Sequence, residues 1–174
     1  MPHAQAFAQE EPAMLPIRTI LHPTDFSKQA EFAFQLACSL ARDYGAELYV
    51  VHVVTPPIVV YGEGVLPVAP ENYQAELREK LNRLHATDSR VRVLHRLVEG
   101  EPVDEILRVA KETGCDLIVM GTHGRRGLGR VIMGSVAEKV VRTAPCPVVT
   151  VRESSALAEQ ASPVERERAA VTAD

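Results

Sequence analysis

Short apolar segments alternate with segments of helical periodicity along most of the chain, and this alternation limits the possible folds more than any other feature. The residues from Ala46 to Val54 are almost all apolar or β-branched, which is typical of a strand covered on both faces of a parallel sheet. Shorter runs of this kind lie at 17–22, 91–98, 116–120 and 148–152. Five strands separated by helices predict a single five-stranded parallel sheet in a Rossmann-like, three-layer α/β/α fold.

The predicted helices follow four of these runs. After Ser27, apolar residues recur at three-and-four spacing as far as Ala41, and Gly45 is placed to end that helix. Further helices are expected at 71–85, 102–113 and 136–143, with Gly114 closing the second of these. The segment 55–70 holds four prolines and two glycines, so it is expected to be a loop, with a lid over one end of the sheet as one reading.

Composition limits the classes of protein that this chain can belong to. The segments 1–16 and 153–174 lack periodic apolar residues and are expected to be a mobile and a disordered tail around one domain, 17–152. The formal net charge of -4 argues against a nucleic-acid partner. No apolar run reaches about 18 residues, which argues against a membrane partner. The widely spaced Cys38, Cys115 and Cys146 indicate free thiols, so a cytoplasmic protein is expected.

A glycine-rich stretch from Gly121 to Ser135 is the strongest indication of a ligand. It contains five glycines and three arginines, and it lies between a predicted strand and a predicted helix. Glycine lets backbone amides approach a ligand closely, and a helix N-terminus attracts anions, so the stretch predicts a phosphate site. It is neither of two common phosphate loops: the dinucleotide spacing is reversed, and no lysine precedes Ser135 as a Walker A loop requires.

The spacing Gly121-x-x-Gly124, nine residues and then Gly134-Ser135 resembles the nucleotide-binding signature of the universal stress protein family. The similarity extends to four further blocks in the same order, and it covers 17–152. These blocks are Ile20–Ser27 (ILHPTDFS), Leu48–Val54, Glu99–Pro102 (EGEP) and Gly134–Val151. The resemblance implies the adenine nucleotide alpha hydrolase-like version of the fold.

The resemblance also implies an adenine-nucleotide site, usually for ATP, with Mg²⁺ as the candidate metal. By this resemblance, the first-strand turn meets adenine and ribose, Val53 lines the adenine pocket, and the later residues follow ribose and phosphates. It further implies a homodimer formed by antiparallel pairing of the last strand, Val148 to Val151. The predicted nucleotide-binding residues are Pro23, Thr24, Asp25, Val53, Met120, Gly121, Thr122, His123, Gly124, Arg125, Arg126, Gly134, Ser135, Val136 and Ala137.

Structural readings of the same residues remain open at this point. Asp25 or Ser27 could serve only to cap the first helix. Ser135 and Glu138 have the S-x-x-E spacing of a capping box, which is compatible with phosphate binding. The arginines at 125, 126 and 130 could form a solvated basic surface. His22 and His52 could be a metal pair on adjacent strands, although core histidines are commoner and no third ligand is evident.

The predicted function is ATP binding in a nucleotide-dependent stress response or in signalling. The glycine-rich stretch offers neither a positioned base nor a metal-binding carboxylate, so no enzyme is expected beyond slow ATP hydrolysis. Two alternatives remain open. One is an adenylating enzyme with the same fold, and the other is an interaction module that does not respond to nucleotide.

Overall fold

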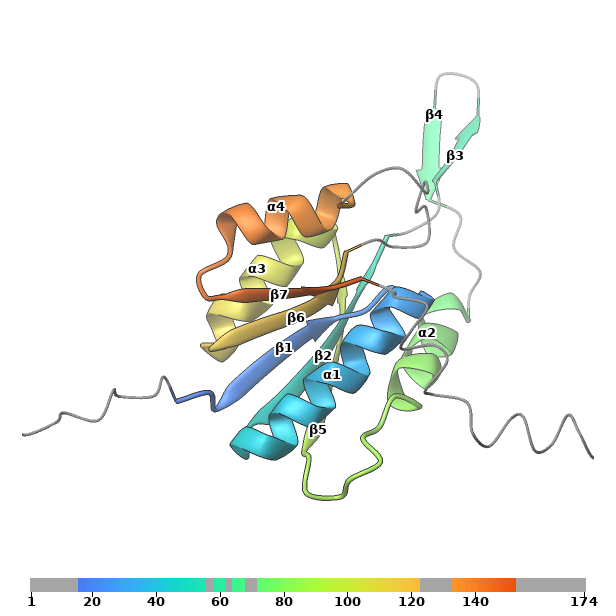
Figure 1. The fold of residues 1–174 in the computed structure, drawn as a ribbon. Helices are drawn as coiled ribbons and strands as arrows, with labels where there is room; N and C mark the ends of the chain where they lie inside the picture. The colour runs from blue at the N-terminus through green and yellow to red at the C-terminus, as the bar shows by residue number, and fades with distance from the viewer. Residues whose placement is uncertain (1–15, 56–57, 62–63, 68–71, 123–132, 153–174) are drawn as a thin grey trace, which may run out of the picture.

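Five parallel strands form the central sheet of the computed structural model, which describes residues 16–55, 58–61, 64–67, 72–122 and 133–152. The spatial order is β5-β2-β1-β6-β7, and each neighbouring pair is parallel (Figure 1). The predicted five-stranded parallel sheet is therefore confirmed. Its strands are β1 (Thr19–Pro23), β2 (Glu47–Val54), β5 (Val93–Glu99), β6 (Leu117–Gly121) and β7 (Val148–Val151).

Helices cover both faces of the sheet. One face carries α1 (Lys28–Tyr44) and α2 (Tyr73–Asn82), and the other carries α3 (Pro102–Thr113) and α4 (Ser135–Thr143) (Figure 1). Successive residues of β1 point to opposite faces, as the period of a strand requires. Ile20 belongs to the core under α1 and α2, and Leu21 to the core under α3 and α4. The result is the three-layer arrangement that the sequence predicts.

The ends of the helices follow from local chemistry. Ser27 caps α1, because its Oγ accepts a hydrogen bond from the amide of Ala30 at 3.2 Å. Gly45 and Gly114 end α1 and α3 with φ angles of 65° and 58°, in the left-handed region that glycine enters without a steric cost. The predicted helix ends at these two glycines are confirmed.

The segment between β2 and α2 differs from the prediction of a loop. It contains a two-stranded antiparallel sheet, β3 (Ile58–Tyr61) with β4 (Gly64–Pro67), which stands apart from the main sheet in Figure 1. The prediction gave too much weight to the prolines. Pro67 lies at the last position of a strand with one neighbour, where a missing amide donor is tolerated, and 58–61 is rich in β-branched residues.

Other boundaries shift by a few residues. α2 is shorter than the predicted 71–85, and β5 begins at Val93 where a start at Val91 was expected. None of the described helices combines the length and the apolar character needed to cross a bilayer. The predicted tails lie, apart from Pro16, outside the described residues, as do parts of the segment interpreted as a lid.

Candidate functional site

The order of the strands defines where a ligand site is expected. From β1 the chain moves to β2 and β5 on one side, and it then returns to β6 and β7 on the other side of β1. In open parallel sheets, ligands bind beyond the carboxyl ends of the strands at such a reversal. Thr24 and Asp25 follow β1 directly, and Thr122 follows β6. These predicted residues therefore lie beside one crevice.

Hydrogen bonds fix the turn that follows β1. The Thr24 amide donates to the Val51 carbonyl at 2.8 Å, which extends the pairing of β1 with β2 by one residue. The Thr24 hydroxyl accepts from the Phe26 amide at 3.1 Å, and the Asp25 carboxylate accepts from the Ser27 amide at 3.0 Å. Because Ser27 caps α1, the alternative that Asp25 serves only as that cap is wrong. The Asp25 side chain instead stabilises the turn at the mouth of the crevice.

Phe26 has a strained backbone in this turn, which the sequence did not indicate. Its φ of 62° is positive, a conformation that is unfavourable for a bulky side chain and that concentrates at functional sites. Its ring lies 4.4 Å from the ring of His52, and the Lys80 ammonium lies 4.5 Å from its centroid. The ring contacts with β2 and α2 hold the residue in place, so the chain can turn sharply just after Asp25.

The end of β6 packs closely against the first turn of α1. A Cβ atom on Gly121 would lie 3.1 Å from both the carbonyl carbon and the Cβ of Gln29, and 3.3 Å from the amide nitrogen of Ala30. These distances are shorter than ordinary van der Waals contacts, and two of the three atoms belong to the helix backbone. Glycine at 121 therefore permits the close approach of β6 to α1 beside the crevice.

Thr122 connects the end of β6 to the start of α4. This buried residue donates its amide hydrogen to Val151 at 2.9 Å, and its carbonyl accepts from the Gly134 amide at 2.7 Å. The two ends of the glycine-rich stretch are thereby joined. His123, Gly124, Arg125 and Arg126, which were predicted to bind phosphate, lie outside the described residues, together with Arg130.

The N-terminus of α4 faces the same end of the sheet. Gly134 is its N-cap, and no side-chain cap hydrogen bond is present at this described helix end. Ser135 is the first helical residue, one position beyond the cap, so the predicted capping box with Glu138 is wrong. Backbone amides at an N-terminus with no side-chain cap, together with the positive end of the helix dipole, can bind an anion.

A cavity of about 160 Å³ lies in the crevice. Seven of the predicted residues line it, whereas Thr122, Gly134 and Ser135 do not, and Ala137 is 4% exposed and packs into the core. Ligand pockets commonly measure about 300 to 1,000 Å³, so this cavity can enclose only part of a nucleotide. The seven predicted residues are Pro23, Thr24, Asp25, Val53, Met120, Gly121 and Val136.

Five lining residues were not predicted: Ala30, Val51, His52, Pro102 and Ile106. Ala30, Val51 and Ile106 belong to the apolar patterns that build the two cores, and those patterns do not distinguish a cavity wall from a core position. Pro102 is the first residue of α3. The sequence offered one indication that His52 lines the cavity, which is its position immediately before the predicted residue Val53.

His22, in β1 next to Pro23, is fully buried. Its Nδ1 lies 2.8 Å from the Val119 carbonyl, so this nitrogen carries the hydrogen, and Nε2 has no hydrogen-bond partner within the described part of the chain. Burial lowers the pKa of His22 to about 4, although the Val119 hydrogen bond and the charge of Asp25 act in the opposite direction. The imidazole is therefore neutral at physiological pH.

The metal-pair hypothesis for His22 and His52 finds no support in this geometry. The Nδ1 atom of His52 lies 2.7 Å from the Thr24 carbonyl, so each histidine directs one ring nitrogen at a backbone oxygen. His22 pairs with Val50 in the sheet, which displaces it from His52 by two residues along β2. Among the residues that the structure describes, no group of three or more metal-binding side chains is present.

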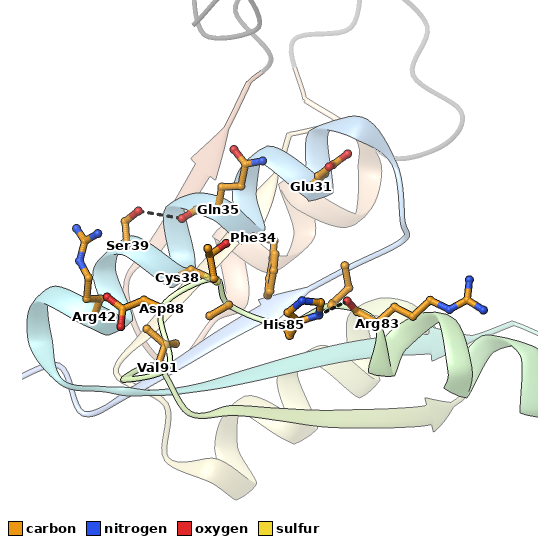
Figure 2. A pocket seen from close by; sticks show the side chains of 13 residues that line it. Glu31, Phe34, Gln35, Cys38, Ser39, Arg42, Arg83, His85, Asp88 and Val91 are labelled. Carbon is orange, nitrogen blue, oxygen red and sulfur yellow. Dashed lines mark hydrogen bonds between the residues drawn. The ribbon is translucent and has the colours of Figure 1, made fainter. Parts of the chain in front are cut away.

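A larger cavity, of about 430 Å³, lies between α1 and the segment from Arg83 to Val91 (Figure 2). None of the predicted nucleotide-binding residues lines it. Cys38 does, but burial raises the pKa of this thiol to about 11, so it is protonated and poorly nucleophilic at neutral pH. Size alone therefore does not make this cavity the functional site.

Comparison with known proteins agrees with the family resemblance of the sequence. The sequence profile of the universal stress protein family matches residues 16–152. A universal stress protein of Methanocaldococcus jannaschii is 36% identical over 140 residues, which cover 78% of this chain and 82% of that protein. The solved structure of the universal stress protein UspA from Lactobacillus plantarum matches with a TM-score of 0.63 and 27% identity, over 80% of this chain and 100% of that one.

Two similar solved structures are described as nucleotide complexes. A universal stress protein from Archaeoglobus fulgidus in complex with dAMP matches with a TM-score of 0.56 and 25% identity, over 79% of this chain and 99% of that one. A universal stress protein in complex with cAMP matches with a TM-score of 0.55 and 27% identity, over 79% and 98%. Both ligands are adenine nucleotides.

Proposed function

The chain belongs to the universal stress protein family, and we propose that it binds an adenine nucleotide, ATP, in the crevice between β1 and β6. One observation carries this proposal. The Asp25 turn, the close-packed Gly121 and the N-terminus of α4 converge where the strand order reverses. The dAMP and cAMP complexes of related proteins support an adenine nucleotide as the ligand.

The parts of the site suit different parts of the nucleotide. The cavity between Val53, Ile106 and Met120 is mostly apolar, which suits the adenine ring. Asp25 at its mouth can accept hydrogen bonds from ribose hydroxyls. The phosphates then extend toward Gly134 and Ser135, where backbone amides and the dipole of α4 favour negative charge. Mg²⁺ would accompany the triphosphate, whose oxygens it prefers as ligands.

The same geometry supports a binding protein more than an efficient hydrolase. Rapid phosphoryl transfer needs a group that orients the attacking nucleophile, and usually protein ligands for the metal. Asp25 lies in the turn after β1, at the part of the crevice assigned to ribose, so it is poorly placed to orient a nucleophile at the phosphates. We therefore propose nucleotide-dependent stress response or signalling, with slow turnover at most, in the reducing cytoplasm that suits three free cysteines.

Isothermal titration with ATP, AMP and adenosine tests the binding site. Asp25→Asn can keep the acceptor oxygen for the Ser27 amide but removes the charge and one acceptor, so we expect affinity for all three ligands to fall about tenfold. Gly134→Val adds a branched side chain at the N-terminus of α4, where the phosphates are placed. It should therefore weaken the binding of ATP more than the binding of adenosine, which has no phosphate. Asp43→Asn, an exposed carboxylate at the far end of α1, is the matched control.

Unchanged affinity in both site variants would exclude this crevice, even if the wild type binds ATP. The alternatives predict different results. An adenylating enzyme releases pyrophosphate when a second substrate is supplied. An interaction module shows no rise in melting temperature with ATP, whereas a ligand at 100 times its Kd stabilises the folded state by about 2.7 kcal/mol.

A homodimer through β7 is the second part of the proposal. In the described sheet β7 has β6 on one side and no strand on the other, and its four residues are only half-buried. Val141 of the adjacent helix α4 is 43% exposed. An antiparallel copy of β7 would pair the open edge. Sedimentation should give a dimer for the wild type and a monomer for Thr150→Lys, and a monomeric wild type at micromolar concentration would contradict the proposal.

A further inference from the structure

Two cysteines that are 31 residues apart in the sequence meet in the fold. The Sγ atoms of Cys115 and Cys146 lie 3.4 Å apart. Cys115 stands between α3 and β6, and Cys146 stands between α4 and β7. Both therefore lie where strands begin, at the end of the sheet opposite the nucleotide crevice. Neither thiol has a role in the proposed nucleotide site.

The backbone on both sides holds the thiols together. The Cys115 amide donates to the Ala110 carbonyl at 3.0 Å, directly after the left-handed residue that ends α3. Cys146 lies between two prolines, whose rings restrict the backbone, and the Pro147 carbonyl accepts from the Ile118 amide of β6 at 3.0 Å. The pair is thus positioned by the end of a helix and by the strand ladder, and both side chains pack with the core under α3 and α4.

We propose that Cys115 and Cys146 are a redox-active thiol pair, which hydroperoxides oxidise to an intramolecular disulfide. Cys146 loses its proton and the thiolate attacks one peroxide oxygen. The O–O bond breaks, a sulfenic acid forms, and the departing hydroxide takes up the released proton and leaves as the first water. The Cys115 sulfur then attacks the Cys146 sulfur, an S–S bond forms, and the second water leaves with the Cys115 proton. Two thiols lose two electrons and two protons, and one hydrogen peroxide becomes two waters. A dithiol reductant returns the disulfide to two thiols and is itself oxidised to a disulfide.

The exposure and hydrogen bonding of the two cysteines indicate which thiol attacks the peroxide and which one then closes the disulfide. Cys115 is 6% exposed, whereas Cys146 is half-buried and is the thiol that peroxide can reach. Burial raises the pKa of both thiols, but the hydrogen bond between them raises the pKa of Cys115 further and lowers that of Cys146. The nearby Asp116 carboxylate raises the pKa of both. Cys146 is accordingly the attacking thiol. Because burial keeps most of this thiol protonated at neutral pH, only a small thiolate fraction reacts, and the oxidation is slow.

The disulfide would enclose the phosphate-binding half of the domain in one covalent loop. Residues 115–146 include β6, the glycine-rich stretch and α4. Closing this loop restricts the unfolded chain, so the oxidised protein should melt at a higher temperature than the reduced protein. The thiol chemistry does not depend on nucleotide binding, so either proposal can fail without the other.

Peptide mapping tests the inference on the full-length protein. Reduced protein is treated with hydrogen peroxide, alkylated, and digested with trypsin without reductant. Before alkylation we expect an intact mass lower by two hydrogens, and after digestion a linked pair of peptides, 112–125 with 143–152, that dithiothreitol separates. Cys38→Ser is the matched control and should give the same linked pair. Cys146→Ser should abolish the linkage, and Cys115→Ala should leave Cys146 as a sulfenic acid that dimedone captures.

Three results would overturn the inference: both thiols still alkylated after peroxide, Cys38 found in the linked peptide, or Cys146 overoxidised while Cys115 stays reduced in the wild type. The peptide map of the wild-type protein detects each of these three results, even if a variant at buried Cys115 fails to fold.

Discussion

Protonation of His22 should control the acid stability of this fold. Its pKa falls from an ordinary 6.5 to about 4 in the folded state, chiefly because the imidazole is fully buried. Between these two values the unfolded chain binds a proton that the folded chain does not, so folding stability decreases as the pH falls. Each pH unit in this window changes the free energy of unfolding by about 1.4 kcal/mol. The fold therefore loses about 3 kcal/mol of stability between about pH 7 and about pH 4.

His22→Asn isolates this contribution. The asparagine amide can replace Nδ1 as the donor to the Val119 carbonyl, but it does not titrate. The variant loses ring packing, including the contact with Phe34 at 5.6 Å between centroids, so its absolute stability should be lower. The informative quantity is therefore the change in unfolding free energy between about pH 7 and about pH 4. We expect that change to be smaller in the variant by about 3 kcal/mol.

Urea unfolding followed by circular dichroism at several pH values measures this quantity, and His85→Asn provides a control at an exposed histidine. Carboxylates that do not interact with His22 contribute equally to wild type and variant, so the difference between the two profiles belongs to His22 and its interaction with Asp25. A variant that loses as much stability in acid as the wild type would refute the reasoning. A nuclear magnetic resonance titration that shows His22 protonating near 6.5 would refute it as well.

Three smaller perturbations test the local geometry. Gly121→Ala places a Cβ against the α1 backbone at Gln29, so we expect a loss of about 1 to 3 kcal/mol and a visible drop in melting temperature. Ser27→Ala removes the cap of α1 and should cost about 1 kcal/mol in urea unfolding, whereas an unchanged midpoint would mean that water replaces the cap. Arg90→Ala should raise the pKa of Asp88 from about 2 toward its ordinary value in a carboxylate titration. It should hardly change stability, because the pair is exposed.

Much of the fold could be predicted because its local and global preferences agree. The run from Ala46 to Val54 is apolar at nearly every position, and it became a central strand with neighbours on both sides. Gly45 and Gly114 have the conformation that ends a helix. The β3–β4 hairpin was missed because the prolines in 55–70 indicate a loop on their own, whereas the pairing depends on where they fall in the strand register.

The sequence indicated which turns meet at the candidate site, but not how their residues pack there. Glycine content indicated a close approach at 121, but only the fold identifies α1 as the element approached. A single sequence also does not show the positive φ of Phe26, since the contacts of its ring with His52 and Lys80 come from elements distant in the sequence. The meeting of Cys115 with Cys146 is likewise a product of the ladder between β6 and β7.

Backbone hydrogen bonds connect the segments that form this crevice. Thr24 is tied to β2, and Thr122 is tied both to β7 and to Gly134, all through main-chain atoms at 2.7 to 2.9 Å. Substitutions of side chains at the mouth, such as Asp25→Asn, can therefore change affinity while the crevice keeps its form. The elements that meet there, β6 and α4, also lie within the segment between the two thiols. The thiols themselves lie at the opposite end of the sheet. Oxidation of the thiol pair would restrict the unfolded chain across that segment, while the native contacts around the crevice stay in place.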